Sequence, residues 1–195
     1  MPSTTELSTG TLRSFLRNET ADLHAAVERA FDLTRPGISR NDYCATLITF
    51  WEILVPLESS IRAITDRELP GYYPRRMRTT MLARDLKCFG IRCDAIRLRT
   101  DIPEILDLPS ALGALYVIEG STLGGQVISR HLERTLGITP EQGGAFFAGY
   151  GAETESLWRE YLDLLESHAT EENRPQILYT AREVFQCFLR GALPV

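Results

Sequence analysis

The chain has 195 residues, of which 44% are hydrophobic and 24% are charged, and its formal net charge is −5. This length and composition are typical of one globular domain, and the acidic balance gives no support for nucleic-acid binding. The four cysteines lack the spacing of a metal site or a disulfide framework, and the N-terminus lacks the basic and apolar regions of a signal peptide. No apolar run reaches the roughly 20 residues of a membrane span. We therefore expect a cytoplasmic protein that does not bind a membrane.

The first part of the chain is expected to form two helices. Apolar residues at helical spacing predict an amphipathic helix over residues 11–33. Ser39 and Asp42 have the spacing of a capping box, which predicts the start of a second helix over about 40–65. Pro56 lies inside that helix and should kink it, because proline lacks a backbone donor.

Further helices follow along the chain. A loop over 69–74 precedes a helix near 75–88 and a less regular helical piece over 92–99. Ser110 is a candidate cap for the next helix, and Thr139 followed by Pro140 is a candidate helix start. The patterns then predict helices over 153–168 and 175–190.

Because alternating strand patterns are absent, the predicted fold is a single all-α domain. We expect a poorly ordered N-terminus over 1–10, one domain over 11–190 and a short C-terminal tail over 191–195.

Residues 115–131 form an apolar helical stretch that contains three glycines, Gly120, Gly124 and Gly125. Each glycine inside a helix costs about 1 kcal/mol relative to alanine, so this stretch gives up local stability. One explanation is a tight turn between helices or a close helix crossing. The other is a kinked helix whose bare backbone lies against a flat ligand.

His24 is one of three histidines, and Glu28 lies one helical turn after it, where its carboxylate could orient the imidazole. The same pair could also be an ordinary surface histidine beside a solvated glutamate. His131 and His168 fall on the polar sides of their helices, so no multi-histidine zinc or di-iron site is expected. A single imidazole facing a glycine-rich helix suits haem iron, which takes one axial histidine and leaves its opposite face open.

Three segments resemble the heme oxygenase family. Residues 20–28, Thr-Ala-Asp-Leu-His-Ala-Ala-Val-Glu, resemble its proximal helix, and residues 120–127, Gly-Ser-Thr-Leu-Gly-Gly-Gln-Val, resemble its distal helix. Residues 145–147, Ala-Phe-Phe, match a segment that the family carries shortly afterwards. The similarity runs in order from about Leu12 to Leu189 and is of the bacterial, bacteriophytochrome-associated type.

The resemblance implies an all-α bundle with haem between a proximal helix and a kinked distal helix. It implies that His24 is the iron ligand, that Glu28 is its partner, and that Gly120 and Gly124 are the distal backbone over the haem. Further residues implied at the site are Arg17 and Arg159 for the haem propionates, Gly125 and Phe188 for cofactor binding, and Ser121, which stands where mammalian members have an aspartate.

The activity implied by the resemblance is oxidative cleavage of haem b, which serves as substrate and cofactor, to biliverdin with release of carbon monoxide and ferrous iron. It requires O2 and an external electron donor such as a ferredoxin or a reductase, because the chain has no flavin or nicotinamide fingerprint. A bacteriophytochrome is the expected recipient of the biliverdin. A haem carrier or sensor on the same fold is one alternative, and a helical scaffold without a cofactor is another.

Overall fold

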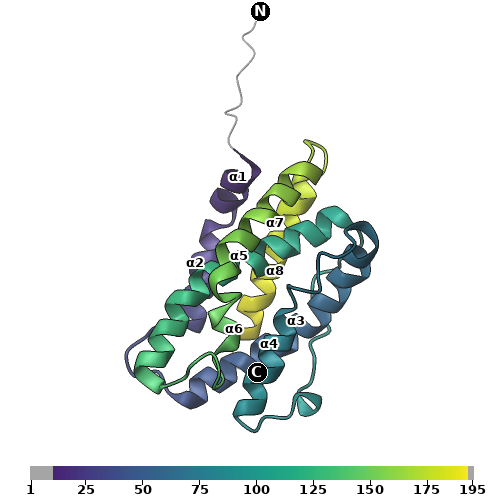
Figure 1. Cartoon of the computed structure of the whole chain (residues 1–195). Helices are drawn as coiled ribbons and strands as arrows, with labels where there is room; N and C mark the ends of the chain where they lie inside the picture. The colour runs from purple at the N-terminus through teal and green to yellow at the C-terminus, as the bar shows by residue number, and fades with distance from the viewer. Residues whose placement is uncertain (1–10, 193–195) are drawn as a thin grey trace, which may run out of the picture.

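The computed structural model describes residues 11–192, and within this range the chain is helical and has no strand (Figure 1). The prediction of an all-α fold is confirmed. The eight α-helices are α1 (Leu12–Glu19), α2 (Ala21–Phe31), α3 (Arg40–Glu68), α4 (Arg78–Cys88), α5 (Leu108–Leu136), α6 (Ala145–Ala148), α7 (Thr154–His168) and α8 (Arg174–Ala192), with two single 3-10 turns, η1 (Cys93–Ala95) and η2 (Gly151–Glu153). The predicted N-terminus over 1–10 and the last three residues of the predicted tail lie outside the described residues.

The long helix α5 runs through the middle of the bundle and packs along α8, with α3, α6 and α7 around it (Figure 1). Glycine permits the close approach of the two central helices, because a Cβ at Gly113 would overlap the carbonyl oxygen of Ile177. The smaller helix α2 packs mainly on α8 and contributes no fully buried residue. One side of α2 is therefore left for contacts other than the core.

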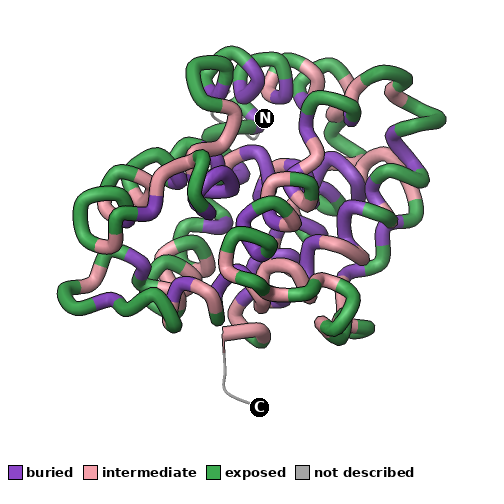
Figure 2. The backbone as a smooth tube through the Cα atoms, turned by 60° about the horizontal axis from the view of Figure 1, so that its bottom comes forward, coloured by how far each residue is buried: buried purple, intermediate pink, exposed green. Residues whose placement is uncertain are grey.

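The core lies where α1, α3, α5, α7 and α8 converge, and Figure 2 shows the buried residues gathered there. Leu12 and Leu16 are fully buried and attach α1 to the bundle. On α7, the buried Tyr161 donates a hydrogen bond of 2.9 Å to the carbonyl oxygen of Leu112 on α5. Apolar burial at helical spacing therefore places the helices around α5.

The predicted single helix over 11–33 was wrong, because the chain breaks at Thr20 into α1 and α2. Thr20 has φ −116° and ψ 1°, which is not helical, and its buried hydroxyl donates a 2.7 Å hydrogen bond to the carbonyl oxygen of Leu16. The same carbonyl also accepts the backbone N–H of Thr20 at 3.0 Å. The break therefore lies in the backbone conformation of a single residue, which apolar periodicity does not register.

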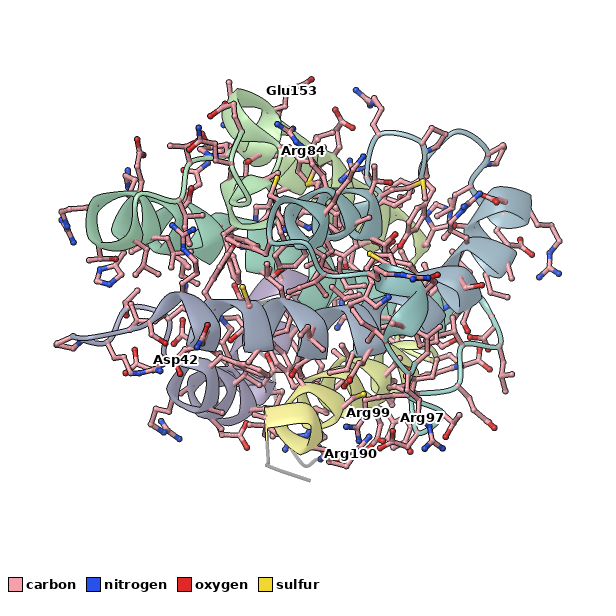
Figure 3. The ribbon with its side chains drawn as sticks, turned by 90° about the horizontal axis from the view of Figure 1, so that it is seen from below. Asp42, Arg84, Arg97, Arg99, Glu153 and Arg190 are labelled. Carbon is pink, nitrogen blue, oxygen red and sulfur yellow. The ribbon has the colours of Figure 1, made fainter. Side chains whose placement is uncertain are left out.

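The capping box at the start of α3 is confirmed. The backbone N–H of Asp42 bonds to the Ser39 hydroxyl at 3.1 Å, and the N–H of Ser39 bonds to the Asp42 carboxylate at 2.9 Å. Figure 3 shows Asp42 at this end of the bundle. The helix continues past Pro56 to Glu68, three residues beyond the predicted end.

Two helix starts are set by carboxylates on distant helices, which the sequence patterns did not reveal. Glu58 of α3 accepts the N–H of Arg78 at 2.7 Å, and α4 begins at Arg78 instead of residue 75. Asp85 of α4 accepts the N–H groups of Ala145 and Phe146, where the short α6 begins. These carboxylates satisfy N–H groups that a helix start leaves open.

Three other local predictions need correction. The segment 92–99 holds only the single turn η1, and no α-helix starts at Thr139 and Pro140. The cap of α5 is Asp107, and Ser110 occupies the third helical position of the same capping box. At α5 both residues of the capping box fit the start signal, and the helix begins after the first of them.

The connection between η1 and α5 is attached to the bundle by an arginine–aspartate cluster (Figure 3). Asp101 lies 2.7 Å from Nη2 of Arg99 and 3.4 Å from Nε of Arg190 on α8. The N–H of Arg99 also bonds to the carbonyl oxygen of Glu52 on α3. These contacts hold the start of α5 between α3 and α8.

Helix α3 is long and apolar enough to cross a membrane by length and composition alone. Within its apolar window, 39% of the residues are buried inside the protein. Core helices of soluble proteins meet the same criterion, so this is weak evidence for a membrane span.

Candidate functional site

His24 lies on the part of α2 that does not face the core, and 56% of its side chain is exposed. Its ring packs edge-on against Phe185 of α8, with ring centroids 5.9 Å apart. Nδ1 is 3.6 Å from Oε2 of Glu28, which is beyond direct hydrogen-bond length but close enough for electrostatic orientation or a bridging water. With Nδ1 directed to the carboxylate, Nε2 is the ring nitrogen available to a metal.

The glycines of α5 separate into two kinds. A Cβ at Gly125 would lie 2.7 Å from the carbonyl oxygen of Phe147, so this glycine is needed for packing against α6. A Cβ at Gly124 would meet nothing within 4 Å, and one at Gly120 would make an ordinary contact of 3.6 Å with Trp158. Protein packing therefore explains Gly125 and leaves Gly120 and Gly124 without a reason inside the protein.

The helix α5 continues through all three glycines from Leu108 to Leu136. A turn between helices is therefore not the reason for the glycines. A close helix approach accounts for Gly125, and its predicted contact with a cofactor stays a prediction. The space beside Gly120 and Gly124 fits the other explanation, in which bare backbone faces a ligand.

The surface around Gly120 and Gly124 is apolar and open to solvent. Leu123 is 40% exposed and Val127 is 56% exposed. Helical spacing places four residues on one face of α5: Gly120, Leu123, Gly124 and Val127. We call this set the glycine face. Such an exposed apolar stripe is typical of a surface that binds a ligand or a partner.

Tyr116 lies one turn before Gly120 and brings the start of α2 close to α5. Burial raises the pKa of Tyr116, and the Thr20 hydroxyl and the charges of Arg13 and Arg17 oppose this rise. Arg13 and Arg17 form no ion pair with any residue in 11–192. Two arginines beside a tyrosine hydroxyl are suited to binding carboxylates.

Two other predicted site residues are occupied with protein contacts. Arg159 on α7 is exposed and lies 2.9 Å from Glu155 of the same helix. Phe188 is buried, and its ring centroid is 5.1 Å from that of Phe50 in the core. The aromatic ring beside His24 is Phe185, three residues earlier on α8.

Ser121 is exposed on α5, and its hydroxyl donates a 2.7 Å hydrogen bond to the carbonyl oxygen of Ile118. The hydroxyl lone pairs are free to accept a further bond, because the only proton is used toward the backbone. Ser121 is therefore placed to hold a water molecule beside the glycine face.

Three residues of this region were missed by the sequence patterns: Tyr116, Trp158 and Phe185. Tyr116 could have been found, because it lies four residues before Gly120 and so shares its helix face. Trp158 stacks on Tyr161 with centroids 5.3 Å apart and lies beside Gly120. Trp158 and Phe185 reach the site from other helices, so only the packing of α7 and α8 reveals them.

A family model described as heme oxygenase matches residues 11–191. Among solved structures, the chain resembles the NO- and CO-bound heme oxygenase of Neisseria meningitidis, with a TM-score of 0.76 and 22% identity over 93% of this chain and 90% of that one. It also resembles heme oxygenase from Leptospira interrogans, with a TM-score of 0.75 and 20% identity over 94% and 98% of the two chains. A third structure is heme oxygenase-1 of the cyanobacterium Synechocystis in complex with heme, with a TM-score of 0.74 and 15% identity over 94% and 91%.

No curated protein matches the chain. At these identities the solved structures support the fold, and the family model supports the family.

Proposed function

Because this chain belongs to the heme oxygenase family, and is therefore an enzyme that acts on haem, we propose that it cleaves haem to biliverdin with release of carbon monoxide and ferrous iron. The observation that carries the proposal is Gly124, whose missing side chain leaves space that no protein atom fills. The glycine face lies on α5, and the exposed His24 lies on α2. Open space on one helix and a single histidine on another fit a flat ligand that is ligated from one side. The iron of haem b, when bound, supplies the oxygen-activating chemistry.

We assign the proximal side to α2. Nε2 of His24 would hold the iron, and Glu28 would orient the ring through Nδ1. Phe185 limits the rotation of the imidazole, because its ring lies edge-on against it. These contacts hold one ring nitrogen outward for the metal.

We assign the distal side to the glycine face of α5. Gly120 and Gly124 would leave room for the haem and for a small ligand, and Leu123 and Val127 would shield them from water. The Ser121 hydroxyl, whose proton goes to the Ile118 carbonyl oxygen, would accept a hydrogen bond from a water molecule and so keep a proton source beside the glycine face.

The propionates of haem would bind at the Tyr116 end, where Arg13 and Arg17 supply positive charge. Arg159 would join them only after leaving Glu155, so we assign it a secondary role. O2 and an external donor, a ferredoxin or a reductase, complete the reaction. We expect a cytoplasmic protein whose biliverdin is passed to a bacteriophytochrome.

The test supplies hemin, O2 and a reductant to the full chain. Loss of the Soret band with growth of a broad red absorption, and biliverdin in the extract, is the expected result. A His24→Ala variant should lose turnover, and His168→Ala is the matched control, because His168 lies at the end of α7, where its ring contacts Ser167 and the carbonyl oxygen of Leu164. A stable ferrous spectrum over many minutes with the wild type would refute the proposal.

A further inference from the structure

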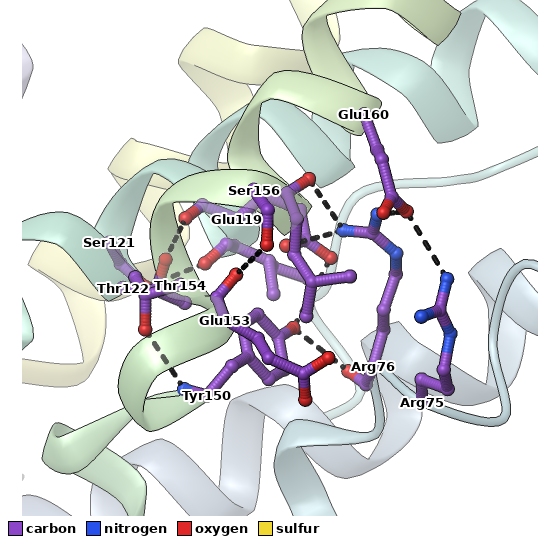
Figure 4. A network of polar contacts seen from close by, with 12 residues as sticks. Arg75, Arg76, Glu119, Ser121, Thr122, Tyr150, Glu153, Thr154, Ser156 and Glu160 are labelled. Carbon is purple, nitrogen blue, oxygen red and sulfur yellow. Dashed lines mark hydrogen bonds and ion pairs between the residues drawn. The ribbon is translucent and has the colours of Figure 1, made fainter.

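A buried ion pair lies next to the segment of α5 that carries the glycine face (Figure 4). Nη1 of Arg76 is 3.1 Å from Oε2 of Glu119, and the two side chains are only 2% and 1% exposed. Glu119 directly precedes Gly120 in the chain. A charged pair is thus buried directly before Gly120, the first residue of the glycine face.

The pair belongs to a chain of polar contacts that reaches the surface. Nη2 of Arg76 lies 3.1 Å from Oε2 of Glu160, which is 49% exposed and also contacts Arg75 at 3.2 Å. On the inner side, the hydroxyl of Tyr150 lies 3.3 Å from Oε1 of Glu119 and 3.3 Å from the carbonyl oxygen of Arg76, and its one proton can be donated to either acceptor. Glu119 is therefore held by two residues from two different segments of the chain.

The arginine is itself fixed to α7. Nη1 of Arg76 donates a 3.0 Å hydrogen bond to the carbonyl oxygen of Leu157, one residue before Trp158. Burial raises the pKa of Glu119, and the charges of Arg76 and Arg78 oppose this rise. The ion pair thus joins α5 to the same turn of α7 that presents Trp158 to Gly120.

The segment of α5 after Glu119 has little rigidity of its own. Gly120 and Gly124 lack side chains that would restrict the backbone, and glycine is a poor helix former. The hydroxyls of Ser121 and Thr122 bond back to the carbonyl oxygens three residues earlier, which competes with regular helix bonds. Contacts from outside the segment must therefore set its position.

Two such anchors flank the segment. Gly125 lies against the Phe147 carbonyl at its C-terminal end, and Glu119 is paired with Arg76 at its N-terminal end. We propose that Glu119 is a positioning residue that, through its buried pair with Arg76, fixes the distance of the glycine face from the haem. The effect on the haem rests on the proposed function, whereas the anchoring of α5 by Glu119 does not depend on it.

The first experiment uses the full chain without haem and measures amide hydrogen exchange. A Glu119→Gln variant keeps the shape and the Tyr150 contact but removes the charge that pairs with Arg76. We expect exchange of the amides over 119–125 to rise at least tenfold. Glu58→Gln is the matched control, because Glu58 is a similarly buried carboxylate whose hydrogen bonds go to Arg78 and Thr79 at the start of α4.

The second experiment measures the C–O stretching frequency of the ferrous carbon monoxide complex of both variants. A merely structural role would lower stability in both variants and leave this frequency unchanged. We expect a shift in Glu119→Gln and none in Glu58→Gln. A protein that binds no haem would refute the proposed function while leaving the exchange result interpretable.

The positioning role is overturned if exchange over 119–125 is unchanged in Glu119→Gln, or if Glu58→Gln changes the frequency equally. Should Glu119→Gln fail to fold, Tyr150→Phe provides the second test, since it removes only the hydroxyl, which contacts Glu119 and the carbonyl oxygen of Arg76, the two residues joined by the ion pair. It should raise exchange over 119–125 by a smaller factor, and no rise overturns the proposal.

Discussion

Replacing Gly124 with alanine should stabilise the protein in the absence of haem and weaken its binding of haem. The added methyl group would meet no protein atom within 4 Å, and Gly124 has helical backbone that alanine adopts freely. The two effects have opposite signs because the methyl group strengthens the helix but occupies space that we assign to the ligand.

The magnitudes follow from the structure. Alanine in place of glycine inside a helix stabilises the folded chain by about 1 kcal/mol. For a chain of this size, that corresponds to an increase in Tm of about 2–4 °C. A methyl group forced into a packed contact costs about 1–3 kcal/mol, which corresponds to roughly 5- to 150-fold weaker haem binding.

The assays are thermal unfolding of the haem-free chain and a hemin titration followed at the Soret band. Gly125→Ala is the matched control, because its Cβ would lie 2.7 Å from the Phe147 carbonyl oxygen. That variant should lower the Tm of the haem-free chain. If Gly124→Ala lowers the Tm, or raises it and leaves haem affinity unchanged, the assignment of the glycine face to the haem is wrong.

Three further predictions can be measured directly. Arg17→Gln should weaken haem binding by about 3- to 10-fold, because one charge near the propionates is lost, and the same substitution with a haem dimethyl ester should change nothing. Burial raises the pKa of Glu58, so the contribution of Glu58 to stability is largest below its ordinary pKa of 4.5 and is lost as the pH rises through the raised pKa. The unfolding free energy of the wild type minus that of Glu58→Gln should therefore fall from pH 4 to pH 8. A difference that grows over this range would contradict the burial argument. Ser39→Ala should cost about 1 kcal/mol in urea unfolding through loss of the α3 cap, whereas an unchanged midpoint would show that the cap adds nothing.

Local sequence signals predicted much of the fold. The capping box at Ser39 and Asp42 formed as expected, because both partners lie within one turn of the same helix. The helices over 153–168 and 175–190 appeared within one residue of their predicted starts, because their apolar spacing is regular and uninterrupted.

The errors arose where a distant residue decided the local structure, or where a single residue left the helical conformation. The start of α4 depends on Glu58, which lies twenty residues earlier, and that of α6 on Asp85, sixty residues earlier. The non-helical backbone of Thr20 divides the first helix, and apolar periodicity does not register it. Sequence spacing contains no information on such long-range carboxylate caps.

The sequence by itself determined the helical class, the family resemblance and the pairing of His24 with Glu28. These features depend on local spacing, which is present in the chain before it folds. The different roles of Gly124 and Gly125 were decided only by the tertiary structure. The two residues are adjacent and chemically identical, but a helix turns about 100° per residue, so one faces open space and the other faces the backbone of α6.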